Sequence, residues 1–100
     1  MLITVGRWMS DAELQQLITT GRVVESNLGG VTNVIFPASS TGYNAAAAGS
    51  CYVEFDVEDS RVVVCVPPPP WGKIYGPGHL FAGTLGIKDM PLAASIRRVI

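Results

Sequence analysis

Two hydrophobic periods follow one another in the first twenty residues. Residues 2–8 (LITVGRW) are rich in apolar and β-branched side chains, which is typical of a strand. Apolar residues then recur three and four positions apart, at Leu14, Leu17 and Ile18, which places them on one face of a helix. We therefore predict a strand over 2–8 and a helix over 11–20.

Both ends of this helix carry local signals of their own. Ser10 can cap the N-terminus, and Glu13 three residues later completes a capping-box pattern. Gly21 follows the last helical residue, where glycine commonly ends a helix in a left-handed conformation. The predicted boundaries thus do not depend on the hydrophobic spacing alone.

The clearest alternation of apolar and polar residues lies at residues 51–57, which we predict to form a strand. Its apolar face would carry Cys51, Val53, Phe55 and Val57. Its other face would carry Tyr52, Glu54 and Asp56. Residues 61–66 follow a polar turn and are predicted as the hairpin partner of this strand.

Shorter β-branched or aromatic runs predict strands at 32–36, 71–75 and 95–100, although the last could instead be a tail. Residues 43–48 are rich in alanine and could form a short helix, whereas 79–94 looks mostly irregular. These elements predict a strand-rich α+β domain whose one clear helix lies near the N-terminus.

Composition limits the class of protein. A chain of 100 residues fits a single domain, so we treat 1–100 as one unit. Hydrophobic residues make up 48% and charged residues 15%, which excludes intrinsic disorder. So much apolar surface predicts a tight core, a covered partner surface, or both.

Charge and hydropathy disfavour two kinds of partner. The net charge of −1 lacks the basic excess that bulk nucleic acid binding requires. No apolar run approaches the ~20 residues of a membrane-spanning helix, so we expect no membrane partner. The first ten residues look like a strand and do not resemble a signal peptide.

The cysteines and the single histidine do not indicate a metal site. Cys51 and Cys65 could pair as neighbouring strand positions, but two small buried apolar residues are the simpler interpretation. No zinc-ligand spacing is present, and His79 is the only histidine. We therefore predict no metal.

Short motifs in a fixed order give the chain a family resemblance. They are Arg7-Trp8-Met9-Ser10, Thr20-Gly21, Gly30-Val31-Thr32 leading to Pro37 and Tyr43, the run Tyr52 to Val57, Lys73-Ile74 with Gly76-Pro77, and Met90-Pro91. Together, over about residues 5–91, they resemble the TreTu family of polymorphic toxin domains, found at the C-termini of Rhs-type proteins.

The resemblance implies a fold and an activity. The fold would be that of an ADP-ribosyltransferase, a small split β-sheet around an NAD cleft. The reaction would transfer ADP-ribose from NAD to elongation factor Tu, which blocks translation in a rival bacterium. A cognate immunity protein would protect the producer, and the domain would be secreted within a larger parent protein and delivered to the cytoplasm of the target cell.

This chemistry indicates three catalytic candidates. Transfer breaks the bond between ribose and nicotinamide through an oxocarbenium-like transition state, which a nearby carboxylate stabilises. Glu54, on the polar face of its strand, is the predicted carboxylate, unless that face is simply exposed to solvent. Arg7 has the donors to anchor NAD, and His79 could bind NAD or accept a proton from the acceptor.

One departure from the broader transferase pattern bears on this choice. Those enzymes usually carry the catalytic glutamate on a late strand, but after Asp59 the only acid here is Asp89. Either Glu54 serves as the carboxylate, or catalysis relies on positioning and hydrogen-bond donors.

Six residues are predicted to bind NAD: Arg7, Ser10, Thr32, Asn33, Tyr43 and Tyr52. The resemblance implies that Tyr43 stacks on nicotinamide, that Tyr52 forms the opposite wall, and that Thr32 and Asn33 line the cleft. Each also has an ordinary interpretation: Ser10 as a helix cap, Tyr43 as a packing residue, and the others as strand residues.

Three other functions remain open at this stage. A metal-independent ribonuclease could use His79, Lys73, Tyr75 and Arg7 for acid and base work, although the near-neutral charge disfavours an RNA groove. An NAD glycohydrolase would share the fold but use water as the acceptor. A non-enzymatic β-rich interaction module would explain the apolar surplus.

Overall fold

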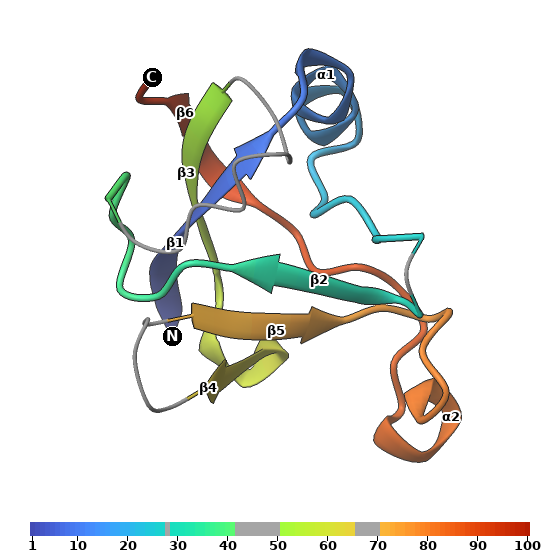
Figure 1. The fold of residues 1–100 in the computed structure, drawn as a ribbon. Coiled ribbons are helices and arrows are strands. Elements are labelled where there is room, and N and C mark those ends of the chain that lie inside the picture. Colours follow the sequence, from blue (N-terminus) through green and yellow to red (C-terminus); the bar gives the residue numbers. More distant parts are fainter. Residues whose placement is uncertain (28, 42–50, 66–70) are drawn as a thin grey trace.

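The computed structural model describes residues 1–27, 29–41, 51–65 and 71–100 (Figure 1). Tyr43 and the short helix predicted at 43–48 lie outside these residues. In chain order, the elements are β1 (Leu2–Met9), α1 (Asp11–Thr20), β2 (Val31–Val34), β3 (Cys51–Glu58), a 3-10 turn (Asp59–Arg61), β4 (Val62–Cys65), β5 (Trp71–Tyr75), α2 (Ala82–Leu85) and β6 (Ala94–Arg98).

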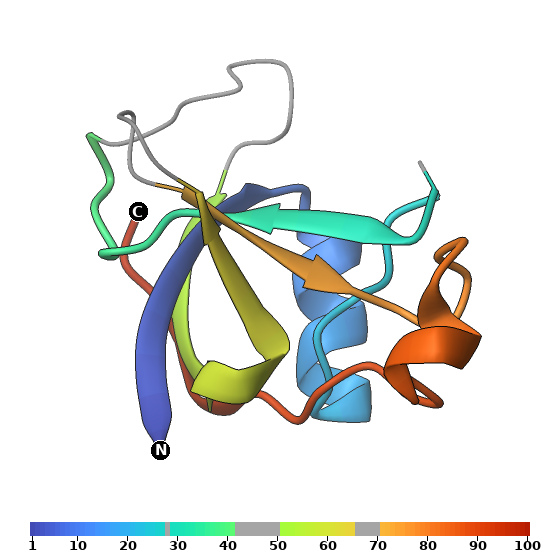
Figure 2. The same ribbon diagram turned by 90° about the horizontal axis from the view of Figure 1, so that it is seen from below.

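The described strands form two small antiparallel sheets, with the orders β1-β3-β6 and β2-β5-β4. Among the described residues, backbone pairing joins the two sheets where Gly6 of β1 pairs with Ile35, just beyond β2. The Gly6 nitrogen donates to the Ile35 carbonyl at 2.9 Å, and the Ile35 nitrogen donates to the Gly6 carbonyl at 2.7 Å. Figure 2 shows the sheets diverging from this region. The predicted α+β class is confirmed.

The predicted hairpin between residues 51–57 and 61–66 is wrong. β3 pairs with β1 on one side and β6 on the other, whereas β4 pairs with β5 in the second sheet. The 3-10 turn between β3 and β4 carries the chain from one sheet to the other. A hairpin was expected from proximity in sequence, but both edges of β3 are occupied by strands from the two ends of the chain.

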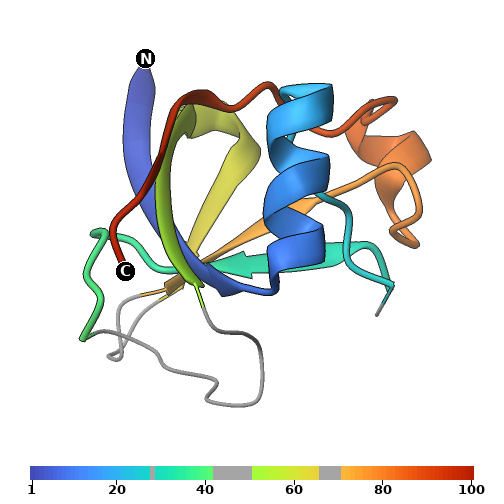
Figure 3. The same ribbon diagram turned by 90° about the horizontal axis from the view of Figure 1, so that it is seen from above.

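α1 is built as its sequence signals predict. The Ser10 hydroxyl accepts the Glu13 amide at 3.2 Å, and Gly21 adopts a left-handed φ of 66°. Leu14 and Leu17 are buried in the core, whereas Ile18 lies at the edge of the apolar stripe and is 55% exposed. Figure 3 shows α1 standing beside the first sheet.

The core lies where α1 and the inner faces of both sheets meet. β1 contributes Val5 and Met9, and the second sheet contributes Val34, Val62 and Ile74. The predicted apolar face of β3 is confirmed, because its four members are all fully buried: Cys51, Val53, Phe55 and Val57. Within the described residues, no helix is long and apolar enough to cross a membrane.

Candidate functional site

The pairing of β1 with β3 separates two of the predicted catalytic residues. Gly6 pairs with Glu54, and Arg7 pairs with Val53. Because side chains alternate between the faces of a sheet, Arg7 lies on the core-facing side with Val53, and Glu54 lies on the opposite side. The structure thus does not bring Arg7 and Glu54 to one surface.

Arg7 joins three elements. Its Nε donates to Glu13 Oε2 of α1 at 2.6 Å, and its Nη2 donates to Glu13 Oε1 at 3.2 Å. Its Nη1 donates to the carbonyl of Asn33 in β2 at 2.7 Å. Both charged side chains are about one-fifth exposed. Three of the five N–H donors of Arg7 therefore meet acceptors among the described residues, and the guanidinium is held in a fixed orientation.

Replacing Arg7 with alanine is expected to destabilise the domain by about 2 kcal/mol, because Glu13 and the Asn33 carbonyl would lose their donors in a largely buried place. Urea denaturation of Arg7→Ala, Glu13→Ala and the double variant measures this. We expect the double variant to lose clearly less than the sum of the single losses. Additive losses would show that the ion pair contributes nothing of its own.

The outward face of β1 and β3 carries a second polar cluster. The Tyr52 hydroxyl donates to Glu54 Oε2 at 3.0 Å. Arg97 of β6 lies between two carboxylates, with Nη2 3.8 Å from Glu54 Oε1 and Nη1 3.6 Å from Asp56 Oδ1. Thr4 of β1 donates to Asp56 Oδ1 at 2.6 Å. About a quarter of each of the two carboxylate side chains is exposed, so a ligand can reach them.

Tyr52 and Trp8 form the apolar part of this cluster. Tyr52 is fully buried, and burial raises its pKa, with the hydrogen bond to Glu54 acting in the same direction. Its hydroxyl therefore stays protonated near neutral pH and donates to Glu54. The Trp8 ring lies 5.4 Å from the Tyr52 ring, and its indole nitrogen is buried without a hydrogen-bond partner among the described residues.

Other predicted NAD-binding residues already have structural partners. Ser10 caps α1, as described above. Thr32 is fully buried, and its hydroxyl donates to the Val24 carbonyl at 2.9 Å and accepts the Ser26 amide at 3.1 Å. Asn33 is exposed, and its backbone carbonyl accepts the hydrogen bond from Arg7 Nη1. Among the predicted NAD-binding residues that the structure describes, only Tyr52 lies with Glu54.

His79 lies in a different part of the molecule, just before α2. Its Nδ1 accepts the Phe81 amide at 3.1 Å, and its ring lies 4.3 Å from that of Tyr75. In Figure 1, α2 lies at the end of β5, away from β6 and the upper part of β3. The structure therefore does not bring His79 to Glu54.

Two features of the site were missed by sequence reasoning. Arg97 was not singled out, because only the pairing of β3 with β6 brings it to Glu54. Glu13 was assigned to the helix cap, but its carboxylate binds Arg7. A charged residue on the core-facing side of a strand, as Arg7 is, signals that a buried partner is needed, and this signal could have pointed to Glu13.

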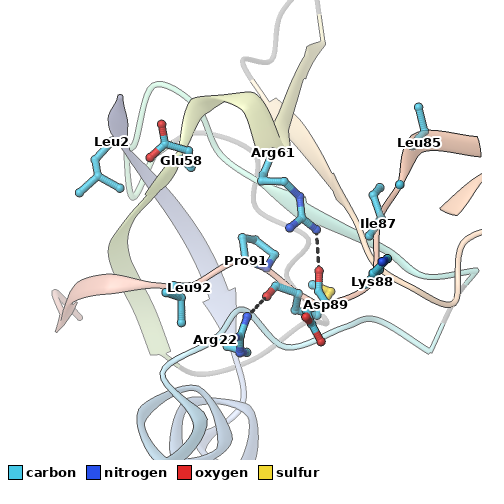
Figure 4. A pocket seen from close by; sticks show the side chains of 12 residues that line it. Leu2, Arg22, Glu58, Arg61, Leu85, Ile87, Lys88, Asp89, Pro91 and Leu92 are labelled. Carbon is cyan, nitrogen blue, oxygen red and sulfur yellow. Dashed lines mark hydrogen bonds between the residues drawn. The ribbon is translucent and has the colours of Figure 1, made fainter. Parts of the chain in front are cut away.

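A hollow of about 530 Å³ lies at another place in the structure (Figure 4). Leu2, Arg22, Glu58, Arg61 and the segment 85–92 line it. None of the predicted site residues that the structure describes borders it. Among the described residues, no three His, Cys, Asp or Glu side chains gather as metal ligands would.

A family model described as "TreTu toxin, C-terminal domain" covers residues 2–97. No curated protein matches the chain.

Proposed function

The chain belongs to the family of TreTu toxin C-terminal domains, and we propose that it is an enzyme that transfers ADP-ribose from NAD to a protein of the target bacterium. The proposed acceptor is elongation factor Tu, whose modification would block translation. The family match over almost the whole chain supports a toxin role. The activity and the acceptor follow from the resemblance described above.

The observation that carries the chemistry is the oriented, partly exposed carboxylate of Glu54. NAD supplies an ADP-ribosyl group whose bond to nicotinamide breaks with positive charge developing on the ribose. Glu54 would lie beside that charge; one of its oxygens already accepts a hydrogen bond from Tyr52, and the other lies 3.8 Å from Arg97. A carboxylate fixed before the reaction stabilises developing charge without reorganisation.

The surroundings of Glu54 fit a ligand with hydrogen-bond acceptors. The indole N–H of Trp8 is a buried donor without a partner among the described residues, which suits an amide or hydroxyl oxygen. Arg97 is 43% exposed, lies 3.8 Å from Glu54, and has N–H donors that can bind a phosphate. Tyr52 acts as a positioning residue, because it is buried and reaches Glu54 by its hydroxyl.

Arg7 has a different role in this proposal. It braces β1 against α1 and β2 through Glu13 and Asn33, behind the strand that carries the candidate site. Its effect on the reaction would thus pass through the position of β1. NAD contact by Arg7 requires a ligand on the core-facing side of the sheet.

The biological setting is part of the proposal. The domain would be secreted within a larger parent protein and would act in the cytoplasm of the target cell. A cognate immunity protein would protect the producer, and covering the face that carries Glu54 and Arg97 would suffice for this.

A transfer assay tests the proposed function. Purified domain is mixed with NAD labelled in the adenylate part and with purified elongation factor Tu, and the proteins are resolved by size. We expect label on elongation factor Tu and release of nicotinamide. Nicotinamide release without labelled protein would make the domain an NAD glycohydrolase. If NAD stays intact, the proposal is overturned, and a ribonuclease or a non-enzymatic interaction module becomes the favoured function.

A further inference from the structure

We propose that the hollow between β1, the 3-10 turn and segment 85–92 is a docking site for the acceptor protein, and that it takes an acidic segment flanked by apolar side chains. The identity of the acceptor rests on the proposed function, whereas the chemistry of the segment rests on the residues that line the hollow (Figure 4).

Two arginines in the hollow are held in place by the backbone. Arg22 Nη1 donates to the Met90 carbonyl at 2.6 Å. Arg61 Nη2 donates to the carbonyls of Tyr75 at 3.1 Å and Asp89 at 2.8 Å. Because these acceptors are neutral, the positive charges are not cancelled by the bonds that orient them. Pre-oriented guanidinium groups with remaining N–H donors are suited to carboxylates.

The charge of the hollow is opposite to that of the rest of the chain. Arg22, Arg61 and Lys88 line it together with Glu58 and Asp89, so its formal charge is +1. The chain has seven cationic and eight acidic residues, which leaves four and six for the remainder, or −2. An acidic segment would therefore be attracted to this surface more than to the remainder of the chain taken together.

Apolar side chains form the border of the hollow. Leu2 is 54% exposed, Leu85 is 56% exposed and Leu92 is 64% exposed. Large exposed leucines around a hollow are typical of a surface that a protein covers. A nucleotide or an inorganic anion would use the cations but would leave these leucines in water, so the border favours a protein.

The position of the hollow suits an acceptor. Leu2 and Glu58 are paired, and by alternation they lie on the same face of β1 and β3 as Glu54. Glu58 lies four residue steps along β3 from Glu54, which corresponds to about 13 Å. A protein docked at the hollow would thus extend along this face and could present a side chain to Glu54.

Substitutions at the border test the proposal through binding alone. The probe is purified elongation factor Tu without NAD, and calorimetry gives the Kd for wild type, Lys88→Glu and Leu92→Ser. We expect Kd to rise about tenfold for Lys88→Glu at low salt, and about fivefold for Leu92→Ser. Added salt should weaken wild-type binding more than that of Lys88→Glu. Arg98→Glu and Ile18→Ser are matched controls, because both residues are exposed and lie outside the hollow.

Steady-state kinetics separates docking from chemistry. The hollow variants should raise KM for elongation factor Tu, while KM for NAD stays within about twofold of wild type. Unchanged Kd, or changes equal to those of the controls, would overturn the docking site. A raised KM for NAD with unchanged acceptor binding would make the hollow a nucleotide site and would equally overturn it. If wild type binds but transfers no label, the proposed function fails while the docking site stands.

Discussion

Replacing Glu54 with glutamine is expected to lower the rate of the proposed ADP-ribosyl transfer about 100-fold, with NAD affinity within about threefold of wild type. Glutamine keeps the length of the side chain and an oxygen that can accept from the Tyr52 hydroxyl, so the local structure should persist. It removes the negative charge, which matters most when positive charge develops on the ribose. Rapid-quench or steady-state measurement of nicotinamide release gives kcat, and calorimetry gives the Kd of NAD.

Asp56→Asn is the matched control for this substitution. Asp56 lies on the same face of β3, two residues away, and also approaches Arg97. It lacks the hydrogen bond from Tyr52, and the proposal gives it no part in catalysis. We expect Asp56→Asn to keep most of the activity. Wild-type turnover in Glu54→Gln, or an equal loss in both variants, would contradict the assignment of Glu54 as the catalytic carboxylate.

Replacing Gly6 with alanine is expected to destabilise the domain by roughly 3 kcal/mol, which is a large part of the stability of a small domain. An added Cβ would meet the Tyr52 hydroxyl and would lie 2.7 Å from two ring carbons of Tyr52. Tyr52 is fully buried, so it has little room to move. Gly6 itself pairs with Glu54 on one side and with Ile35 on the other, so its backbone cannot easily shift to relieve the clash. Urea denaturation monitored by circular dichroism measures the loss.

Gly83→Ala serves as the control for Gly6→Ala. Gly83 lies in α2, and an added Cβ would have no described atom within 4 Å apart from its chain neighbours and the backbone of its own helix, so alanine there should be neutral or slightly stabilising. Shortening the clashing side chain tests the mechanism further: Gly6→Ala should cost less in a Tyr52→Ala background than in wild type. Equal costs in the two backgrounds would show that Tyr52 is not the source of the strain.

The elements that sequence predicted well are those with local signals. α1 has a cap at Ser10, a left-handed glycine at Gly21 and buried residues at helical spacing, and its bounds match the prediction. β3 has the clearest alternation in the chain, and its apolar face is buried as expected. Such signals depend on neighbouring residues, so a single sequence contains them.

What sequence could not predict depends on contacts between distant residues. Alternation placed Glu54 on the polar face of its strand, but only the register with β1 shows that Arg7 lies on the other side. A position on the polar face of the strand also did not mean exposure to solvent, because Tyr52 lies on that face and is fully buried. Strand partners are set by packing of the whole domain, as the pairing of β4 with β5 shows.

The first sheet brings together strands from both ends of the chain: Gly6 from the first strand, Glu54 from the middle and Arg97 from the last. During synthesis, Glu54 therefore leaves the ribosome well before Arg97, and β3 must wait for β6 to occupy its second edge. The complete cluster can form only after residue 97 has emerged. A ribosome that makes this domain would thus have translated past residue 97 before the proposed translation-blocking activity could arise nearby.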